Sequence, residues 1–368
     1  MMIIFWRKGE MEMPSTSFRV GIIGFGGIGE QHFLHLSRFQ DVAVEVICDQ
    51  DENRLRKAQQ VCGMPRLATC AEEVFSLPLQ AVVVATPNVT HYPLVKEALL
   101  RGWHVLCEKP FTMDVTQAEE LCRLAGAREL VHMVAFSYRF VPAVKMLREI
   151  LERGQAGRIY HVRCHYLQSW LASPFAPYSW RLDVQQSGSG VLGDLGSHVF
   201  DLAEFLTGKK FLRVQACART FIPERKDPFS GEKRKVTVDD AVGVWGEMEE
   251  GIFFTAEMSR CAAGRGNAFT VEVNGDRGGF LLDVEKPGEL LACPEPFTGY
   301  THFRSNFASF PCPSSFGPVD HYYAQTEAFV QDLRGEPVVL PSFFEGWRTQ
   351  RVLDTCIRSI QKGGWQSI

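Results

Sequence analysis

The chain has 368 residues, of which 45% are hydrophobic and 22% are charged, and its formal net charge at pH 7 is −4. This length predicts two domains, and this composition is typical of a globular, soluble protein. The small negative charge offers no basic field, so we expect no nucleic-acid partner. Acidic residues interrupt the short basic run that includes Arg225 and Lys233–Lys235, which we interpret as a solvated loop.

The N-terminus and the cysteines bear on the cellular compartment. The apolar stretch Met2–Trp6 is too short for a signal sequence or a membrane span. We therefore expect residues 1–17 to form a tail outside the fold, and we expect no membrane partner. The eleven cysteines form no CxxC pair, which is typical of reduced thiols in a cytoplasmic protein.

Short apolar runs alternate with helical segments in residues 18–140. The apolar runs predict strands at Arg19–Ile23, Val42–Cys48, Ala81–Ala85, His104–Cys107 and His132–Ala135. The segments between them predict helices at Ile28–Leu36, Glu52–Val61, Ala71–Phe75, Tyr92–Arg101 and Val115–Glu129. Strands that are apolar throughout and separated by helices indicate a parallel sheet buried on both faces. We therefore predict a doubly wound Rossmann domain over residues 18–140.

The pattern changes after Val141. Helices are predicted at Pro142–Glu152, Gly193–Leu206, Tyr322–Leu333 and Glu345–Lys362. Strands are predicted at Ile159–Leu167, Val214–Phe221, Val242–Glu249, Gly251–Glu257, Phe269–Asn274 and Gly278–Asp283. Because turn-like sequences join several of these strands, residues 141–368 are predicted to form a second domain with an antiparallel or mixed sheet.

A glycine-rich loop follows the first predicted strand and opens a helix. Its residues are Gly24, Phe25, Gly26, Gly27, Ile28 and Gly29, in a GxGxxG pattern. The first glycine permits the tight turn, the second lets the backbone approach a pyrophosphate, and the third lets helix and strand pack closely. The N-terminus of the helix then faces the phosphate charge. This context predicts a dinucleotide site.

Asp49 stands twenty residues beyond Gly29, at the end of the second predicted strand. A carboxylate there can accept hydrogen bonds from the adenosine ribose hydroxyls and would repel a 2′-phosphate. No Arg or Lys occurs in Gln50–Glu52, directly after it. We therefore predict NAD as the cofactor, in preference to NADP. The alternative, a capping Asp at a strand–helix turn, can coexist with this role.

Three further clusters carry candidate chemistry. Thr86-Pro87-Asn88 and Glu108-Lys109-Pro110 each follow a strand, at the sheet edge where ligands bind in open α/β folds. Asp194 and His198 are spaced i and i+4, on one face of a predicted helix. Oxidising a secondary alcohol needs a base for the hydroxyl proton, and histidine suits this role near neutral pH.

We assign Lys109, Asp194 and His198 as the candidate catalytic set. Lys109 can donate a hydrogen bond to the reacting oxygen. Asp194 can orient the imidazole of His198 and bind a second hydroxyl. The alternatives are an ordinary helix-face pair, or a metal site that also includes Asp201. We predict no metal, because no further ligand cluster is visible and hydride transfer to a nicotinamide does not require one.

These motifs resemble the Gfo/Idh/MocA family of oxidoreductases, the group of glucose–fructose oxidoreductase and inositol dehydrogenase. The resemblance runs from about Arg19 to the C-terminal helix. It rests on the ordered set GxGxxG, Thr86-Pro87-Asn88 with His91, Glu108-Lys109-Pro110, Arg139-Phe140, Trp180-Arg181 and Asp194-x-Gly196-x-His198-x-x-Asp201. Two positions depart from the family pattern, since Gly188-Ser189-Gly190 replaces a triple glycine and Ser137 replaces an asparagine.

The resemblance implies a fold and a set of site residues. The fold is α/β, an N-terminal Rossmann doubly wound parallel sheet plus a C-terminal α+β domain with a large open, mostly antiparallel sheet. Lys109 and His198 would act on the reacting hydroxyl, beside Asp194, and the Lys109–Pro110 bond would be cis. The cofactor would be lined by Thr86, Pro87, Asn88, His91, Glu108 and Lys109. The substrate candidates are Tyr138, Arg139, His165, Gln168, Trp170, Trp180 and Arg181.

The predicted function is hydride transfer between NAD and a hydroxyl or keto group of a sugar, anhydrosugar or cyclitol. The resemblance further implies a homodimer or homotetramer that assembles through the C-terminal sheet. One alternative is an NAD-dependent glycoside hydrolase that uses transient oxidation, which net turnover of free NAD would distinguish. Another is a non-catalytic dinucleotide-binding regulator, and the presence of Lys109, Asp194 and His198 argues against it.

Overall fold

The computed structural model describes residues 17–62, 65–304 and 320–368. The tail predicted at residues 1–17 lies outside this range except for Ser17. Within the described ranges, no helix combines the length and apolar character needed to cross a membrane. The ten cysteines that the structure describes are all free thiols.

The N-terminal half forms a six-stranded parallel sheet with the order β3-β2-β1-β4-β5-β6. Its strands are β1 (Phe18–Ile23), β2 (Val42–Cys48), β3 (Arg66–Ala68), β4 (Ala81–Val84), β5 (His104–Cys107) and β6 (His132–Val134). Its helices are α1 (Gly27–Leu36), α2 (Glu52–Cys62), α3 (Ala71–Phe75), α4 (His91–Leu100) and α5 (Val115–Gly126). This strand order is that of a Rossmann fold, which confirms the predicted doubly wound sheet.

Local sequence signals account for several boundaries in this domain. Every residue of β4 is fully buried, as expected for a central strand covered on both faces. Gly102 follows α4 with φ +77°, the left-handed conformation that ends many helices. The carboxylate of Asp114 accepts a 2.9 Å hydrogen bond from the backbone N–H of Gln117 and caps α5. The sequence did not predict β3, which has only three residues.

The second half forms a nine-stranded sheet with the order β16-β15-β14-β13-β7-β12-β11-β8-β17. Its strands are β7 (Ile159–Leu167), β8 (Phe211–Arg219), β11 (Ala241–Met248), β12 (Phe253–Ser259), β13 (Ala268–Gly275), β14 (Gly278–Asp283), β15 (Glu289–Pro294), β16 (Thr301–Arg304) and β17 (Gln366–Ser367). Only β7 and β12 pair in parallel, so the prediction of a mostly antiparallel sheet is confirmed.

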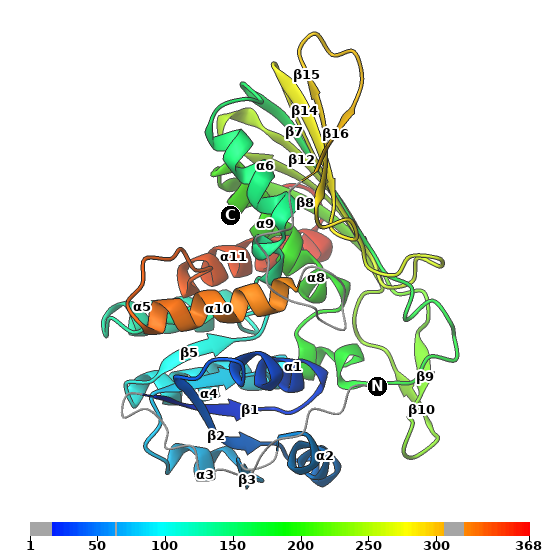
Figure 1. The fold of residues 1–368 in the computed structure, drawn as a ribbon. Helices are drawn as coiled ribbons and strands as arrows, with labels where there is room; N and C mark the ends of the chain where they lie inside the picture. The colour runs from blue at the N-terminus through cyan, green and yellow to red at the C-terminus, as the bar shows by residue number, and fades with distance from the viewer. Residues whose placement is uncertain (1–16, 63–64, 305–319) are drawn as a thin grey trace, which may run out of the picture.

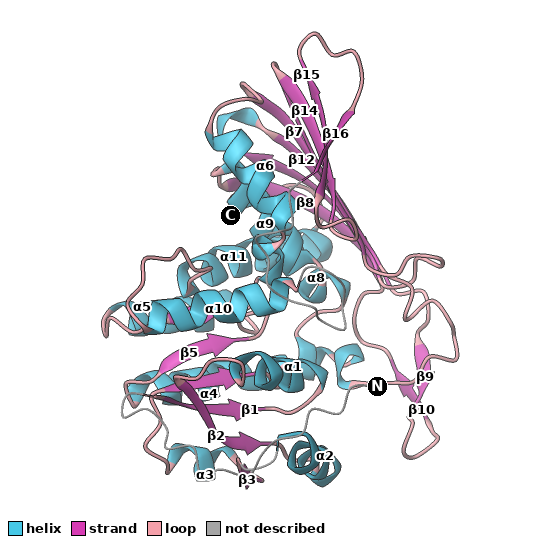
Figure 2. Ribbon diagram, in the orientation of Figure 1, coloured by secondary structure: helices cyan, strands magenta, loops and turns pink. Residues whose placement is uncertain are grey.

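Helices cover one face of this sheet. They are α6 (Pro142–Glu152), α9 (Gly196–Thr207) and α11 (Phe343–Lys362), and Figure 2 shows them on the same side of the strands. Their apolar side chains share one core with the inward-facing residues of the strands, among them Phe200, Phe254 and Phe269. No described helix lies on the opposite face.

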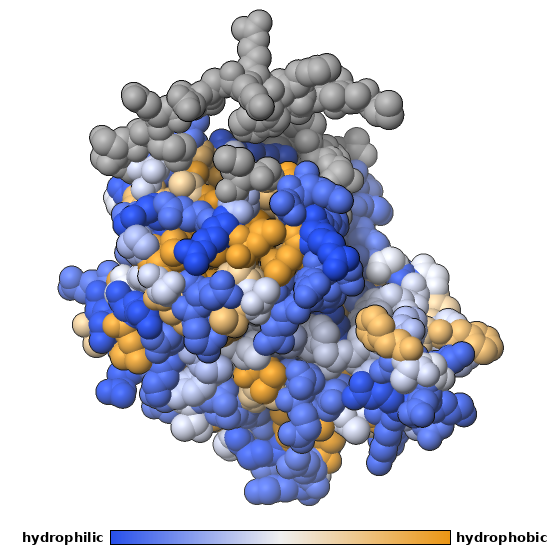
Figure 3. Space-filling model, turned by 90° about the horizontal axis from the view of Figure 1, so that it is seen from below, coloured by the Kyte–Doolittle hydropathy of each residue, from blue (hydrophilic) through white to orange (hydrophobic). Residues whose placement is uncertain are grey.

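The C-terminal part of the chain also returns to the Rossmann domain. Helix α10 (His321–Leu333) places Phe329 and Val330 in the same core as Val20 and Ile22 of β1. Two polar contacts add to this packing: Arg334 forms an ion pair with Asp41 at 2.7 Å, and His35 Nε2 lies 3.0 Å from Asp320 Oδ2. The face seen from below in Figure 3 is mostly hydrophilic, with hydrophobic residues in scattered patches.

Two expectations are wrong in detail. The helix predicted at Gly193–Leu206 is divided at Leu195 into α8 (Val191–Asp194) and α9. The basic run predicted as a solvated loop forms a hairpin of β9 (Glu224–Lys226) and β10 (Lys233–Lys235). Arg225 of this hairpin is only 1% exposed, because its guanidinium donates hydrogen bonds to the carbonyl oxygens of Leu171, Ser173 and Ala176.

Candidate active site

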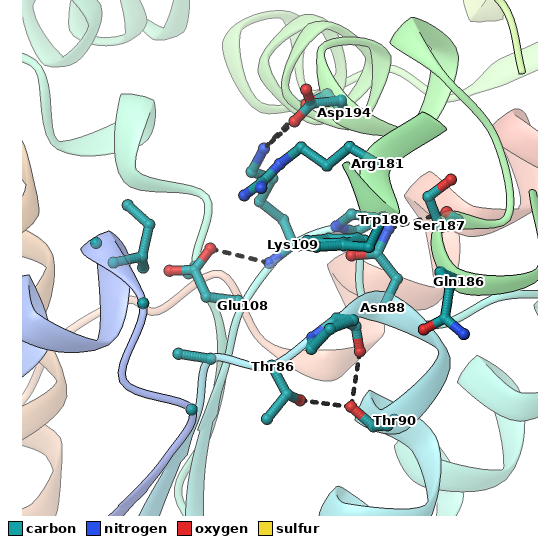
Figure 4. Close-up of a pocket in the computed structure, with 18 of the residues that line it drawn as sticks. Thr86, Asn88, Thr90, Glu108, Lys109, Trp180, Arg181, Gln186, Ser187 and Asp194 are labelled. Carbon is teal, nitrogen blue, oxygen red and sulfur yellow. Dashed lines mark hydrogen bonds and ion pairs between the residues drawn. The ribbon is translucent and has the colours of Figure 1, made fainter. Parts of the chain in front are cut away.

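A cavity of about 1030 Å³ opens at the carboxyl edge of the parallel sheet, and the second domain closes its other side. Most predicted site residues line it: Gly24, Gly26, Gly27, Ile28, Asp49, Thr86, Pro87, Asn88, Glu108, Lys109, Tyr138, Gln168, Trp180, Arg181, Asp194 and His198. Figure 4 shows how the residues that follow β4 and β5 face residues of the second domain, such as Trp180, Arg181 and Asp194. Trp170 lines the cavity as well, whereas five predicted site residues do not: Phe25, Gly29, His91, Arg139 and His165.

The glycine loop has the shape that a pyrophosphate requires. Gly24 has φ +93°, and a Cβ there would overlap the carbonyl oxygen of Ala85. A Cβ at Gly27 would meet nothing within 4 Å, so this part of the loop leaves open space for a ligand. Helix α1 begins there, and Gly26 caps it without a side-chain hydrogen bond. A phosphate can therefore approach the backbone N–H groups of the first turn.

Asp49 has the structural role considered for it, and its carboxylate also borders the cavity. Its Oδ2 accepts a 2.7 Å hydrogen bond from the backbone N–H of Phe25, and its Oδ1 accepts one of 2.9 Å from Asp51. The carboxylate thus ties the glycine loop to the end of β2, and it also borders the cavity, with 8% of the residue exposed. Arg54 of α2 approaches Oδ2 at 3.4 Å. This cation was not anticipated, because it lies two residues beyond the Gln50–Glu52 segment.

The backbone and not the side chain of Phe25 serves the site. Its ring is buried against Phe33, with 6.4 Å between ring centroids. Gly29 lies behind the loop, where a Cβ would overlap the carbonyl oxygen of Gly24. This close approach is the helix–strand packing expected of the third glycine.

The prediction that His91 lines the cofactor is wrong. His91 is fully buried, and its ring nitrogens lie 2.9 Å from the carbonyl oxygen of Pro110 and 3.0 Å from that of Thr86. Burial lowers the pKa of this histidine. The imidazole therefore joins the two loops that follow β4 and β5, so that it positions cavity residues without contacting a ligand.

Arg139 does not reach the substrate end of the cavity either. Its guanidinium is buried and forms a bidentate pair with Asp201, with Nε donating to Oδ2 at 2.9 Å. Asp201 belongs to α9, three residues after His198, so this pair anchors the helix that carries the candidate base. Because Arg139 takes both oxygens of Asp201, the alternative of a metal site built on Asp194, His198 and Asp201 loses a ligand.

Lys109 and Asp194 form the polar centre of the cavity. Lys109 Nζ donates hydrogen bonds to Asp194 Oδ1 at 2.8 Å and to the Asp194 carbonyl oxygen at 3.1 Å, and the first is drawn in Figure 4. The Lys109–Pro110 peptide bond is cis, as predicted. Burial alone would raise the pKa of Asp194, but the charges of Lys109, Arg260 and Arg181 hold it well below its usual range. Asp194 is therefore a carboxylate at neutral pH.

His198 lies beside this pair but is not hydrogen-bonded to Asp194 by any contact that the structure gives. Its ring packs edge-on against Tyr138, with 4.6 Å between centroids, and its buried Nδ1 has no partner among the described residues. Burial lowers the pKa of His198 well below its usual value, and the Lys109 ammonium lowers it further. The imidazole is thus neutral at pH 7 and can accept a proton. Aromatic packing orients it, in place of the carboxylate that we expected.

The carboxylate of Glu108 is held by His32 and by the backbone of Lys109. Its Oε1 lies 2.9 Å from His32 Nε2, and its Oε2 accepts a 3.3 Å hydrogen bond from the backbone N–H of Lys109. Burial favours the neutral acid, but the His32 hydrogen bond and the Lys109 charge keep the pKa of Glu108 below its usual value. Glu108 therefore carries a negative charge at the cofactor end of the cavity.

A hydrogen-bonded network of neutral side chains lines the substrate end. The hydroxyl groups of Tyr138 and Tyr166 are 2.6 Å apart, and both contact Asn267 at 2.9 Å. Gln168 Nε2 donates to Asn267 Oδ1 at 2.7 Å, and Trp170 Nε1 donates to Gln168 Oε1 at 2.8 Å. Amide and hydroxyl groups beside aromatic faces suit a polyhydroxyl ligand, whose polar edges and apolar faces need both.

Trp180 and Arg181 border the same end from η3 (Trp180–Leu182). The guanidinium of Arg181 lies over the Trp180 ring, 4.5 Å from its centroid. Below them, Asn88 Nδ2 donates a 2.9 Å hydrogen bond to the carbonyl oxygen of Ser187. This contact joins the loop after β4 to the segment of the second domain that carries Trp180, and Figure 4 shows these side chains close together.

Several lining residues escaped the sequence analysis, among them Arg260, Asn267 and Tyr166. Arg260 and Asn267 follow β12 and precede β13, in segments without a recognisable motif. Tyr166 lies on β7, where we had chosen its neighbour His165. The structure places His165 on the exposed face of the strand and Tyr166 on the buried one. Alternation along β7 was the available signal, because Cys164 and Val162 share the face of Tyr166.

Comparison with known proteins identifies the family. The profile described as "Oxidoreductase family, NAD-binding Rossmann fold" matches residues 18–136, and that of the "GFO/IDH/MocA C-terminal domain" matches residues 144–281. The chain belongs to the Gfo/Idh/MocA family. It therefore shares the family's NAD-binding Rossmann fold, and the glycine loop and Asp49 fit that cofactor in their geometry.

Relatives within the Gfo/Idh/MocA family match almost the whole chain. Levoglucosan dehydrogenase of Pseudarthrobacter phenanthrenivorans is 29% identical over 96% of this chain and 98% of its own. An uncharacterized oxidoreductase of Synechocystis is 32% identical over 96% of this chain and 97% of its own. The structure of levoglucosan dehydrogenase in complex with NADH and L-sorbose superposes with a TM-score of 0.88 at 30% identity, covering 96% of this chain and 99% of that one.

Proposed function

We propose that this protein is an NAD-dependent dehydrogenase that oxidises a hydroxyl group of a sugar, anhydrosugar or cyclitol, or reduces the corresponding ketone. The observation that carries the proposal is the placement of Lys109 and a neutral His198 at the end of a dinucleotide cavity, beside the Tyr138–Asn267 network. Levoglucosan dehydrogenase, named for an anhydrosugar, supports the substrate class.

The residues divide the reaction between them. The chemistry that NAD supplies when bound is acceptance of a hydride at its nicotinamide ring. Gly24–Gly29 and Asp49 would hold its pyrophosphate and adenosine ribose, while Thr86, Asn88 and Glu108 border the path toward the substrate. Asp194 keeps the Lys109 ammonium at the substrate end through the 2.8 Å hydrogen bond.

Proton transfer falls to His198. The neutral imidazole takes the proton of the substrate hydroxyl as the carbon loses hydride, and Lys109 donates a hydrogen bond to the same oxygen. In the reverse direction, His198 returns the proton to the oxygen. The aromatic rings around His198 exclude water from the imidazole and hold its orientation.

The test is NAD reduction, followed at the nicotinamide absorbance, against a panel of aldoses, anhydrosugars and inositols. On the best substrate, Lys109→Ala and His198→Ala should each lower kcat by about 10²- to 10⁴-fold, the usual contribution of a positioned acid or base. Lys96→Ala is a matched control, since Lys96 pairs with Glu120 and does not line the cavity. Full activity in both cavity variants would refute the proposed roles. Glycoside cleavage without net NADH would indicate the hydrolase alternative.

We propose that the protein assembles as a homodimer or homotetramer through the face of the nine-stranded sheet that no described helix covers. Trp245 of β11 pairs with Thr255 of β12, and Phe253 lies two residues before Thr255, on the same face of the sheet. The two aromatic residues are 45% and 44% exposed. An exposed aromatic surface without a covering helix is typical of a subunit contact. Trp245→Glu should shift the mass measured by light scattering toward the monomer. Phe229→Glu, at a 96% exposed position on the β9–β10 hairpin, should leave the mass unchanged.

We propose a domain boundary at residues 140/141 and a cytoplasmic location. The boundary is supported by the change from the parallel sheet, which ends at β6, to the mixed sheet, which begins at β7. The location is supported by the free thiols of the described cysteines, which suit a reducing compartment. Limited proteolysis tests the domain boundary, and cell fractionation tests the location.

A further inference from the structure

Arg260 is a buried cation directly behind the catalytic pair. It follows the last residue of β12, and its residue exposure is 0% although its side chain borders the cavity. A buried guanidinium is costly unless its charge and its donors find partners. The partners of Arg260 are therefore informative about what this charge does.

The first partner is Asp194. Arg260 Nη1 lies 3.6 Å from Asp194 Oδ2, while Asp194 Oδ1 accepts the hydrogen bond from Lys109. The two oxygens of one carboxylate thus face two different cations. Such an arrangement fixes the rotation of the carboxylate, and with it the direction in which Lys109 is held.

The second partner is Asp239, which holds the segment that carries Asp194. Arg260 Nη2 donates a 3.1 Å hydrogen bond to the carbonyl oxygen of Asp239. The carboxylate of Asp239 in turn accepts hydrogen bonds from the backbone N–H groups of Gly190, at 3.0 Å, and Leu192, at 2.8 Å, at the start of α8. A Cβ at Gly190 would overlap Asp239, so the glycine permits this contact.

The third partner is the substrate end of the cavity. The Arg260 guanidinium lies over the Trp170 ring, 5.5 Å from the ring centroid. The backbone carbonyl oxygen of Arg260 accepts a 3.0 Å hydrogen bond from the backbone N–H of Leu171. Trp170 also donates to Gln168 of the neutral network. One side chain therefore contacts both the catalytic carboxylate and the wall that faces the substrate.

We propose that Arg260 is a positioning residue for hydride transfer, which acts through Asp194 to hold Lys109 against the reacting oxygen. This inference rests on the proposed function. If the inference is right, the loss of kcat caused by removing Arg260 depends on whether the Asp194 carboxylate is present.

A double-mutant cycle on kcat tests the proposal. Arg260→Met should lower kcat by about 10- to 100-fold, the loss expected when a charge-assisted contact is removed. In an Asp194→Asn background the same change should cost less than about threefold, because the carboxylate on which Arg260 acts is already gone. An equal loss in both backgrounds would overturn the proposal, since it would mean that Arg260 acts only on the fold or on Trp170.

Two further variants keep the test decisive. Arg260→Lys retains the charge, so its kcat should be at least about fivefold higher than that of Arg260→Met. If Arg260→Met does not fold, the cycle is run with Arg260→Lys instead. Arg225→Met is the matched control, since Arg225 is equally buried and binds carbonyl oxygens of the same loop without contacting Asp194. It should raise KM, with the same small effect on kcat in both Asp194 backgrounds.

Binding of NADH, followed by its fluorescence, provides a readout that is independent of catalysis. Arg260→Met should keep the Kd for NADH within about twofold of the wild type, because the glycine loop and Asp49 are untouched. Full activity in Arg260→Met together with inactive Lys109→Ala would reject this inference and leave the proposed function standing. Full activity in Lys109→Ala and His198→Ala would reject the proposed function itself.

Discussion

At the scale of single residues, His198 and Asp194 lie in the same buried end of the cavity and yet carry different charges at neutral pH. Burial disfavours the charged form of both groups. For His198, burial and the Lys109 charge act in the same direction, so that the imidazole stays neutral. For Asp194, three neighbouring cations outweigh burial, so that the carboxylate stays ionised. The site thus holds a proton acceptor beside an anchored ammonium group.

This balance predicts the pH dependence of alcohol oxidation. A histidine with a lowered pKa is protonated, and so disabled as a base, only at pH values below the ordinary value of 6.5. Activity should therefore persist at pH 6.5 and fall only at lower pH. The measurement is kcat/KM for the best substrate between about pH 4.5 and pH 9, a range that spans the ordinary pKa of histidine. An acid limb centred at or above 6.5 would show that His198 is not the base or that it is not buried in solution.

Asp49 should decide the choice of cofactor. Asp49→Ala removes the acceptor for the ribose hydroxyls and the hydrogen bond from Phe25, so the KM for NAD should rise by about 10- to 100-fold. Discrimination against NADP should fall in parallel, because the repulsive charge is gone and Arg54 remains. Steady-state kinetics with both cofactors measures the change. Glu52→Ala serves as the control, since Glu52 is exposed, pairs with Arg56 and does not line the cavity.

Sequence patterns could reveal residues whose spacing carries a meaning of its own. Lys109 follows a strand, and Asp194 and His198 are four residues apart, so these positions were accessible from the sequence alone. Arg260 and Asn267 were not, because only the tertiary fold brings the ends of β12 and β13 to the cavity. His91 and Arg139 matched family motifs, but their side chains support the site from behind.

At the scale of secondary structure elements, period and length governed what the sequence could show. Strands such as β2, β5, β7 and β14 have the predicted bounds, because continuous or alternating burial produces a clear pattern. The short strands β3, β9, β10 and β17 have two or three residues and leave no period to detect. The break between α8 and α9 was also hidden, because Leu195 keeps nearly helical torsion angles.

The junction of β1 and α1 provides a prediction at this scale. Gly29→Ala should push α1 away from the glycine loop, because the added Cβ would overlap the Gly24 carbonyl oxygen, at a cost of about 1–3 kcal/mol or more. Its melting temperature should therefore fall. Gly27→Ala adds the same methyl group where it meets nothing within 4 Å, so it should keep the melting temperature and weaken NADH binding alone. Differential scanning fluorimetry and NADH titration separate the two effects; equal melting temperatures would contradict the packing argument.

At the scale of the whole molecule, α10 packs against the N-terminal domain and brings His321 to the ring of Tyr138. The two rings are stacked with 5.2 Å between centroids, and burial lowers the pKa of His321 to about 4. Between pH 6.5 and 4 the unfolded chain therefore takes up a proton that the folded chain does not. The stability that this histidine confers is present above pH 6.5 and is lost as the pH falls toward 4.

The expected outcome is a melting temperature that declines from pH 6.5 to pH 4, with a shallower decline in His321→Phe. Phenylalanine keeps a planar ring against Tyr138 but has no group that can bind a proton. Calorimetry of both proteins across this range measures the difference between the two slopes. Parallel slopes would mean that His321 is accessible to protons in the folded state.

The return of α10 to the first sheet also has a consequence for biosynthesis. Phe329 and Val330 share a core with Val20 and Ile22, and Phe343 packs into the second core of the same domain. The ribosome releases these partners long after the six strands have emerged. The Rossmann domain therefore waits for α10 and Phe343 before this part of its apolar surface is covered, and a chain that stops short of α10 leaves that part open to chaperones and proteases.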